Sequence, residues 1–197
     1  MSQGIIGKIR ANGLRRENLN VIPSVKEVEE AYKKATEAFY WFDVTTMPVA
    51  SFDRSDSSTY KEIDGMLYHR VMSDTIKTYA DLEKYLYALF TDEIVAELLD
   101  HGWDYQRYRD IDGVLHAILA DRGTDIFKGE ETKEVTQESE VKFTCAVCVE
   151  LLGGEEDFVV TGYEIHEYSY ELIDGQWVFY KLLSVPLIII FIVSRWK

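Results

Sequence analysis

The two cysteines, Cys145 and Cys148, form a C-x-x-C sequence, a spacing typical of redox-active disulfides and of half a zinc site. The segment around them, residues 141–151, alternates in the manner of a β-strand, which places Cys145 on the apolar face and Cys148 on the opposite face. Strand residues three positions apart lie about 10 Å from each other, which is too far for a disulfide. Because no second cysteine pair exists to complete a zinc site, we interpret both as strand residues without redox or metal chemistry.

The histidines offer no metal-binding or catalytic pattern. None of the four is spaced in the H-E-x-x-H manner; they are His69, His101, His116 and His166. His69 and His116 follow two Asp-Gly pairs at similar offsets, so we interpret them as surface neighbours on paired strands. The chain also lacks the G-x-S-x-G sequence of a serine hydrolase and a glycine-rich phosphate loop, and its 35 acidic residues single out no acid–base pair. The sequence therefore predicts a protein that is not an enzyme and holds no metal or cofactor.

Charge is spread unevenly along the chain, whose net charge is −14. Residues 1–23 carry a net charge of +3, whereas residues 120–175 hold fifteen acidic residues against four basic ones, a net charge of −11. Such a surface repels nucleic acid and anionic lipid, and it suits either a basic protein partner or solubility alone. The residues that we expect to bind a partner are Asp121, Arg122, Asp125, Glu130, Glu131, Glu134, Glu155, Glu156 and Asp157.

Two further groups of side chains stand out: charged residues that could be buried as pairs, and aromatic residues that could line a pocket. Asp43, at the end of the first predicted helix, and the pair Asp121 and Arg122 are expected to be buried and paired, with the arginine fixing a polar turn. Aromatic residues outside the apolar stripe of that helix could instead line a pocket or an interface. The candidate pocket residues are Tyr40, Trp41 and Tyr68.

The elements that must position these residues begin with a helix over residues 24–42. Ser24 and Glu27 form a capping box after a proline, and apolar residues then recur at three- and four-residue steps. Two shorter helices are predicted to start at Thr78 and Thr91. Ile-Asp-Gly occurs three times, at residues 63–65, 111–113 and 173–175, and Asp-Gly between apolar runs is a strong signal for a β-hairpin.

The third of these hairpins passes a register test. A two-residue loop at residues 174–175 places Leu172 opposite Trp177 and Tyr170 opposite Phe179, so that all four share one face. The first two copies do not separate as cleanly into two faces, so longer loops are expected there. A change of apolar phase after Ile165 predicts a β-bulge at residues 166–167.

The order of these elements favours one α+β domain over residues 24–185, with N-terminal helices packed on a curved antiparallel sheet. Residues 1–23 are predicted to form a flexible arm, without the apolar stretch of a signal peptide. Residues 186–197 contain seven consecutive apolar residues, far fewer than the ~20 that a membrane-spanning helix requires. We interpret them as a final strand or tail; membrane association, and the choice between a monomer and a weak dimer, stay open.

Several phrases of the sequence, taken in order, resemble one known family. They are residues 39–42 (FYWF), 60–68 (YKEIDGMLY), 78–86 (TYADLEKYL), 89–94 (LFTDEI), 108–115 (YRDIDGVL), 120–123 (ADRG) and 174–179 (DGQWVF). Over roughly residues 25–182 the chain resembles the IseA-type D,L-endopeptidase inhibitors of Gram-positive bacteria. The resemblance implies a cystatin-like or NTF2-like fold, an extracytoplasmic or cell-surface location, and inhibition of cell-wall cysteine peptidases by an acidic surface that blocks the active cleft.

Two other functions stay open at this stage. One is an NTF2-like domain that binds or converts a small molecule in a pocket between helix and sheet, with a buried carboxylate or histidine of shifted pKa. The other is an envelope domain with a structural role and no separable activity.

Overall fold

The computed structural model describes residues 21–51, 56–100, 105–120, 123, 125–153, 158–181 and 187–190. Within them the elements, in chain order, are α1 (Val25–Asp43), β1 (Tyr60–Ile63), β2 (Met66–Arg70), α2 (Tyr79–Tyr87), α3 (Asp92–Leu99), β3 (Tyr108–Ile111), β4 (Val114–Ile118), β5 (Lys128–Ser139), β6 (Lys142–Gly153), β7 (Val159–Ile173), β8 (Gln176–Lys181) and β9 (Leu187–Ile190). The predicted α+β class is confirmed. The strands form two antiparallel sheets, however, where the sequence analysis expected one.

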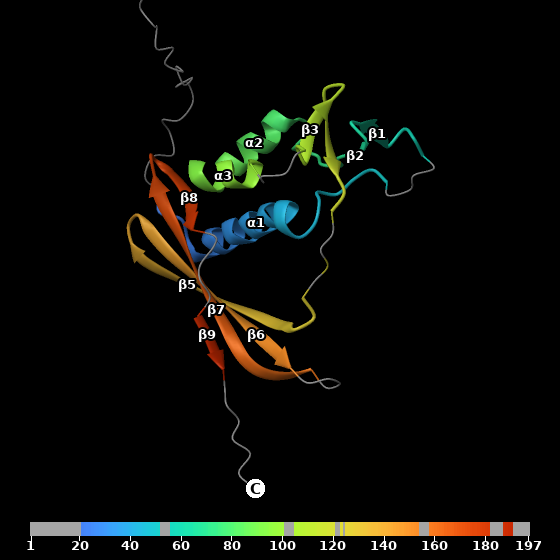
Figure 1. Cartoon of the computed structure of the whole chain (residues 1–197). Helices are drawn as coiled ribbons and strands as arrows, with labels where there is room; N and C mark the ends of the chain where they lie inside the picture. Colours follow the sequence, from blue (N-terminus) through green and yellow to red (C-terminus); the bar gives the residue numbers. More distant parts are fainter. Residues whose placement is uncertain are drawn as a thin grey trace, which may run out of the picture.

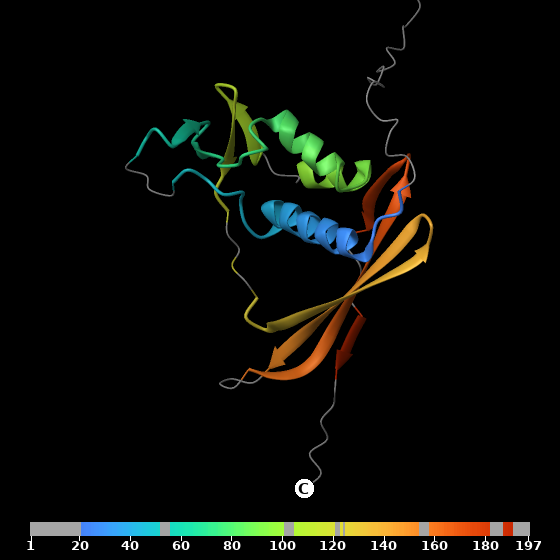
Figure 2. The same cartoon turned by 180° about the vertical axis from the view of Figure 1, so that it is seen from behind.

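Helix α1 is the central layer of the molecule. It crosses one face of a long, twisted five-stranded sheet of order β5-β6-β7-β8, with β9 also paired to β7, and α2 and α3 cover its other side (Figures 1 and 2). The smaller sheet, of order β1-β2-β4-β3, lies beside the C-terminal end of α1. All three described helices therefore lie on the same side of the five-stranded sheet.

The start of α1 is confirmed in detail. The Ser24 hydroxyl accepts the Glu27 backbone N–H, and the Glu27 carboxylate accepts the Ser24 N–H, so two helix-end donors are satisfied reciprocally. Thr78 and Asp81 form a second capping box at α2. At α3, Thr91 makes no such side-chain bond, and its buried hydroxyl has no hydrogen-bond partner among the described residues.

Strand β3 fixes the other end of α1. The buried Tyr108 hydroxyl donates to the Trp41 carbonyl at 2.9 Å and accepts the Met47 N–H at 3.0 Å. Arg107 donates to the carbonyls of Phe42 and Thr45, which places a cation at the negative end of the helix dipole. Contacts remote in sequence therefore hold the end of the helix.

All three Asp-Gly pairs form two-residue hairpin loops. Both residues have positive φ in each case, 54° and 78° at the first two pairs and 51° and 79° at the third, as a type I′ turn requires. The predicted pairing of Leu172 with Trp177 and of Tyr170 with Phe179 is confirmed. The longer loops expected at the first two pairs are wrong, because Ile63 pairs directly with Met66 and Ile111 with Val114.

The prediction of surface positions for His69 and His116 is also wrong. The two histidines are 2% and 5% exposed, respectively. In the β2–β4 pairing His69 lies opposite Ala117 and His116 lies opposite Arg70, so the two rings point to opposite faces of the small sheet. Each ring nitrogen Nδ1 contacts a backbone carbonyl, that of Ser51 or Val114, which meets part of the polar demand of burial.

In the five-stranded sheet, β7 keeps one alternation through residues 162–171. The β6–β7 register runs without a shift from Leu151↔Gly162 to Lys142↔Glu171, so the predicted bulge at residues 166–167 is wrong. Register shifts lie instead between Leu151 and Leu152 in the β6–β7 pairing and between Ser169 and Tyr170 in the β7–β8 pairing. The alternation of apolar residues in the sequence shifts because the β7 side chains that face α1 are apolar at one end of the strand and polar at the other.

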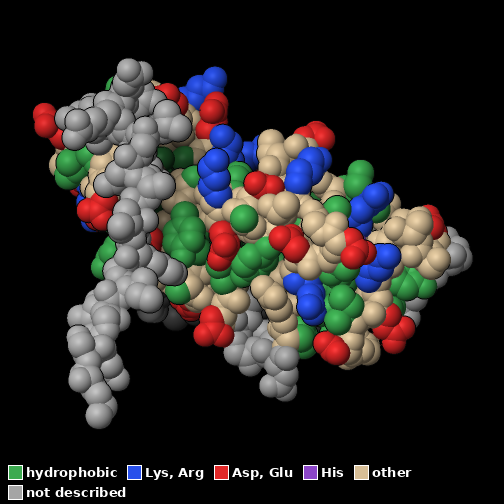
Figure 3. Space-filling model, turned by 90° about the horizontal axis from the view of Figure 1, so that it is seen from above, with side chains coloured by type: hydrophobic (Ala, Val, Ile, Leu, Met, Phe, Trp, Pro, Cys, Tyr) green, Lys and Arg blue, Asp and Glu red, His purple; other side chains and the backbone are tan. Residues whose placement is uncertain are grey.

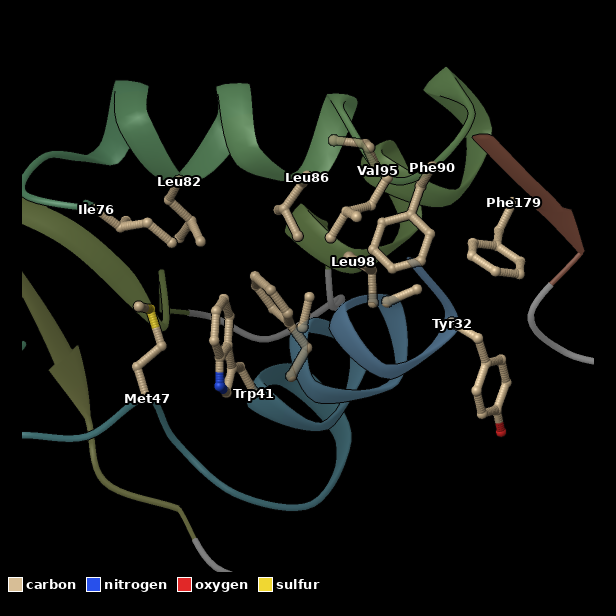
Figure 4. Packing of buried hydrophobic residues seen from close by; sticks show 14 of the residues in the cluster. Tyr32, Trp41, Met47, Ile76, Leu82, Leu86, Phe90, Val95, Leu98 and Phe179 are labelled. Carbon is tan, nitrogen blue, oxygen red and sulfur yellow. The ribbon is translucent and has the colours of Figure 1, made fainter. Parts of the chain in front are cut away.

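The hydrophobic core lies between α1, α2, α3 and the adjacent half of the five-stranded sheet, and it includes Tyr108, Leu115 and Ala117 of the small sheet. Leu82, Leu86, Phe90, Val95 and Leu98 point from α2, α3 and the segment between them toward α1; the residues labelled in Figure 4 are Tyr32, Trp41, Met47, Ile76, Leu82, Leu86, Phe90, Val95, Leu98 and Phe179. Asp43 is exposed, so its predicted burial is wrong. The predicted arm falls mostly outside the described residues, and residues 187–190 of the predicted tail form β9 beside β7.

Candidate functional site

One face of the five-stranded sheet carries none of the described helices; we call it the outer face (Figures 1 and 2). Strand alternation and the pairing registers assign side chains to it. The outer-face residues of β5, β6 and β7 are Thr132, Glu134, Thr136, Lys142, Thr144, Ala146, Cys148, Glu150, Tyr163, Ile165, Glu167, Ser169 and Glu171. This face therefore combines hydroxyls and small apolar groups with carboxylates.

The outer face is acidic. Glu134 and Glu167 lie on either side of Ala146 in one row across three strands, which separates their backbones by about 10 Å. Glu150 lies further along β6. The Lys142 ammonium is 3.2 Å from the Glu171 carboxylate, so that pair is locally neutral. By contrast, acidic and basic side chains are intermixed over α2 and α3 on the opposite side of the molecule (Figure 3).

The residues expected to bind a partner do not form one surface. Of the described ones, Glu134 faces outward, whereas Glu131 faces α1 and lies 3.1 Å from the Lys133 ammonium. Glu130 is exposed at an irregularity of β5, where its N–H donates to the Glu150 carboxylate at 3.2 Å. Asp125 is exposed and accepts the N–H of residue 127 at 3.0 Å. Outside the described residues lie Asp121, Arg122, Glu155, Glu156 and Asp157.

The opposite face of the same sheet, next to α1, carries a polar cluster that the sequence analysis did not predict. The Glu164 side chain is 11% exposed and pairs with the Lys128 ammonium. Its other oxygen lies 2.9 Å from His166 Nε2, and because a carboxylate only accepts, this imidazole nitrogen donates. The His166 ring stacks on Tyr168 with centroids 6.0 Å apart. A carboxylate, an imidazole, an ammonium and a phenol thus lie together; we call these four residues the polar cluster.

The electrostatics of the polar cluster follow from burial. Burial, and then the nearby Lys128 ammonium, lower the pKa of His166, while Glu131 opposes them. Burial also raises the pKa of Tyr168 to about 12. The imidazole is therefore held in its neutral form near neutral pH, the state in which one nitrogen donates and the other can accept a proton.

The three candidate pocket residues lie in three different settings. Tyr40 is 45% exposed at the C-terminal end of α1, near the polar cluster, and burial followed by the Glu131 charge raises its pKa. Trp41 belongs to the core and stacks on Tyr85 at 5.6 Å. Tyr68 is buried in β2 with Arg109 over its ring, and its hydroxyl donates to a backbone carbonyl. The three residues therefore do not line a common pocket.

The cysteines lie as the sequence analysis predicted. Cys145 is buried on the helix side of β6, and burial raises the pKa of its thiol to about 11. Cys148 is half-buried on the outer face, and both thiols are free. In the described part of the chain, no three histidine, cysteine or acidic side chains are grouped so that they could hold a metal ion.

Comparison with known proteins adds no relative to this picture. No protein-family model matches the chain, and no curated protein matches it significantly. Among the described residues, no helix is both long and apolar enough to span a bilayer.

Proposed function

We propose that this protein is an inhibitor of bacterial cell-wall D,L-endopeptidases that binds them through the outer face of its five-stranded sheet. The observation that carries the proposal is the acidic outer face, which none of the described helices covers, with Glu134, Glu150 and Glu167 on three adjacent strands. The resemblance to IseA-type inhibitors supplies the target, a cysteine peptidase with an active cleft, and an extracytoplasmic location. A long helix cupped by a bent sheet suits the cystatin-like or NTF2-like fold that the resemblance implies.

Electrostatic attraction makes this proposal testable by salt. Raising the ionic strength from about 0.1 M to about 1 M shortens the Debye length from about 10 Å to about 3 Å, so association steered by the outer face should slow. The experiment measures inhibition of a papain-like D,L-endopeptidase on isolated cell walls, together with its association rate by interferometry. We expect stoichiometric inhibition that weakens with salt, and inhibition absent at both salt concentrations would refute the function.

A charge-matched pair of variants tests the surface itself. The variant Glu134→Gln/Glu150→Gln/Glu167→Gln neutralises the outer face, and Glu37→Gln/Glu62→Gln/Glu97→Gln removes the same charge from α1, β1 and α3. At about 0.2–1 kcal/mol for each of the three charges, the first variant should bind about 3- to 150-fold more weakly. Equal affinities of the two variants would show that net charge, rather than the outer face, attracts the peptidase.

The polar cluster favours a second candidate function, the binding of a small polar molecule beside α1. Glu164 positions His166 and Lys128, and Tyr40 offers a half-exposed ring nearby. Such mixed donors and acceptors, placed next to aromatic rings, are typical of sites that orient a polar ligand. Screening a fragment library by ¹H–¹⁵N shifts on the wild type and on Glu164→Gln would test it. Binders that perturb β7 in the wild type alone would support it, and an absence of binders to β7 would exclude it.

A further inference from the structure

Five large apolar residues at one end of the five-stranded sheet are exposed to solvent. Ile126 is 62% exposed, Phe127 53%, Phe158 43%, Val159 55% and Val160 43%. We call these residues the apolar tip. Single exposed apolar side chains are ordinary, whereas several that adjoin each other usually mark an interaction site.

The members of the apolar tip lie at one end of the sheet, where the Phe127 and Phe158 rings are in contact, although the consecutive strand residues Val159 and Val160 point to opposite faces. The Phe127 and Phe158 rings lie 6.3 Å apart, although the residues are far apart in sequence. The Leu152 N–H donates to the Phe127 carbonyl at 2.7 Å, and Leu152 also pairs with Val160. The start of β5, the end of β6 and the start of β7 thus meet at this end of the sheet, below α1 and remote from α2 and α3 (Figure 1).

The backbone at Phe158 supports a role for this surface. Its φ is +41°, a left-handed conformation that bulky residues rarely adopt. Holding a non-glycine residue there has an energetic cost, and such strain tends to collect at binding sites. Glycine or asparagine would fit this backbone better, yet the position carries an aromatic ring that is 43% exposed.

The charges around the apolar tip select the kind of partner. Asp125, Glu130 and Glu150 lie beside it, while the nearby Lys128 ammonium is paired with Glu164. A second copy of this chain would bring acidic rims together, and an anionic membrane would repel them as well. A partner whose apolar surface is surrounded by lysine or arginine would match both the apolar tip and the acidic residues around it.

We propose that the apolar tip is a docking site for a protein partner whose apolar contact surface is rimmed by basic residues. Phe127 and Phe158 are its anchors, because aromatic side chains dominate interface energies. Glu150 borders both the apolar tip and the outer face, but Phe127 and Phe158 are not among the outer-face residues, so the proposal goes beyond the inhibitor function.

The test uses an amphipathic model peptide with leucines on one face and lysines around them, titrated into the full-length chain by calorimetry and by ¹H–¹⁵N shifts. The tip variant Phe127→Ser/Phe158→Asn keeps the backbone, since asparagine suits positive φ. The control Met72→Ser/Tyr87→Ser removes two apolar side chains of similar exposure, 53% and 42%, elsewhere. We expect shifts at residues 126–127 and 158–160, and affinity at least ~10-fold lower for the tip variant alone.

Other results would overturn the proposal. Equal peptide affinity of both variants, or shifts centred elsewhere, excludes the apolar tip. Sedimentation that reveals wild-type dimers absent from the tip variant would assign it to self-association, and flotation with phosphatidylcholine–phosphatidylglycerol vesicles would assign it to lipid. A protein that binds the peptide at the tip but inhibits no D,L-endopeptidase keeps this proposal and loses the inhibitor function; inhibition together with failed tip binding does the reverse.

Discussion

Replacing Tyr108 by phenylalanine removes one buried hydroxyl and changes almost nothing else in shape. That hydroxyl joins two parts of the chain, because it donates to the Trp41 carbonyl at 2.9 Å and accepts the Met47 N–H at 3.0 Å. Tyr108 is 1% exposed, and its neighbours Trp41 and Met47 are 7% and 2% exposed. Water therefore cannot easily take the place of the hydroxyl, and the Tyr108→Phe variant leaves a buried donor and a buried acceptor unpaired.

The expected cost follows from these two groups. A buried backbone group left without a hydrogen bond costs about 1–3 kcal/mol, and the loss is partly offset because the phenol itself no longer needs burial. We therefore expect the free energy of unfolding to fall by about 2–4 kcal/mol. For a domain of this size each kcal/mol lowers the melting temperature by about 2–4 °C, so Tm should fall by about 4–16 °C.

Urea titration and calorimetry measure this change, with Tyr180→Phe as the control. Tyr180 is 52% exposed, so its hydroxyl bonds to water and its removal should change stability by less than about 0.5 kcal/mol. Amide exchange at Met47 adds a local readout and should accelerate in the Tyr108 variant. A loss of stability no larger than that of the control would refute the claim that this hydroxyl fixes the end of α1.

Three further outcomes are expected. Because the pKa of His166 is lowered from its usual 6.5, the unfolded chain binds the proton more readily; stability should rise with pH toward about 6.5 and then level off, and His166→Gln should flatten that slope in urea titrations. A slope that survives the substitution would assign the pH dependence to another group. Ser24→Ala should lower the free energy of unfolding by about 1 kcal/mol through loss of the cap at α1, and an unchanged denaturation midpoint would contradict this. Iodoacetamide on the native protein should label Cys148 before Cys145, whose pKa is raised to about 11, and the reverse order in peptide mass spectra would conflict with the described burial.

Local signals predicted much of the fold. The capping box at α1 and the Asp-Gly turn at residues 174–175 were predicted because they depend on residues three or fewer positions apart, whereas the other two Asp-Gly turns were expected to have longer loops. The pairing of β2 with β4 depends instead on contacts between residues about 50 positions apart, as in His69↔Ala117, and no local pattern encodes it. One sheet was therefore expected where two exist.

The candidate site was harder to predict for a different reason. The phase change in β7 was interpreted as a bulge on the assumption that a side facing a helix stays apolar. Glu164 and His166 in fact lie on the same side of the strand, facing α1. Their burial is tolerated because Glu164 pairs with Lys128 of β5 and with His166 itself. Trp41 was assigned to a pocket because α1 was given one apolar stripe. The helix packs against the sheet and also against α2, so its buried arc is wider and includes Trp41.

The small sheet has a pseudo-twofold axis that passes between His69 and Ala117. Residues 60–70 and 108–118 are both hairpins that begin with a tyrosine and contain the same Ile-Asp-Gly sequence at the turn. A half-turn of the sheet places each hairpin on the other, because residue 68 lies opposite 118 and residue 70 lies opposite 116. An isologous interface of this kind, normally seen between subunits, is built here within one chain. Its two halves differ in their surroundings, because Tyr108 is buried against α1 while its counterpart Tyr60 is half-exposed beside His69. The hairpin of residues 108–118 thus anchors the end of α1 through its first tyrosine, whereas the hairpin of residues 60–70 is held through Tyr68 and His69, which are both buried.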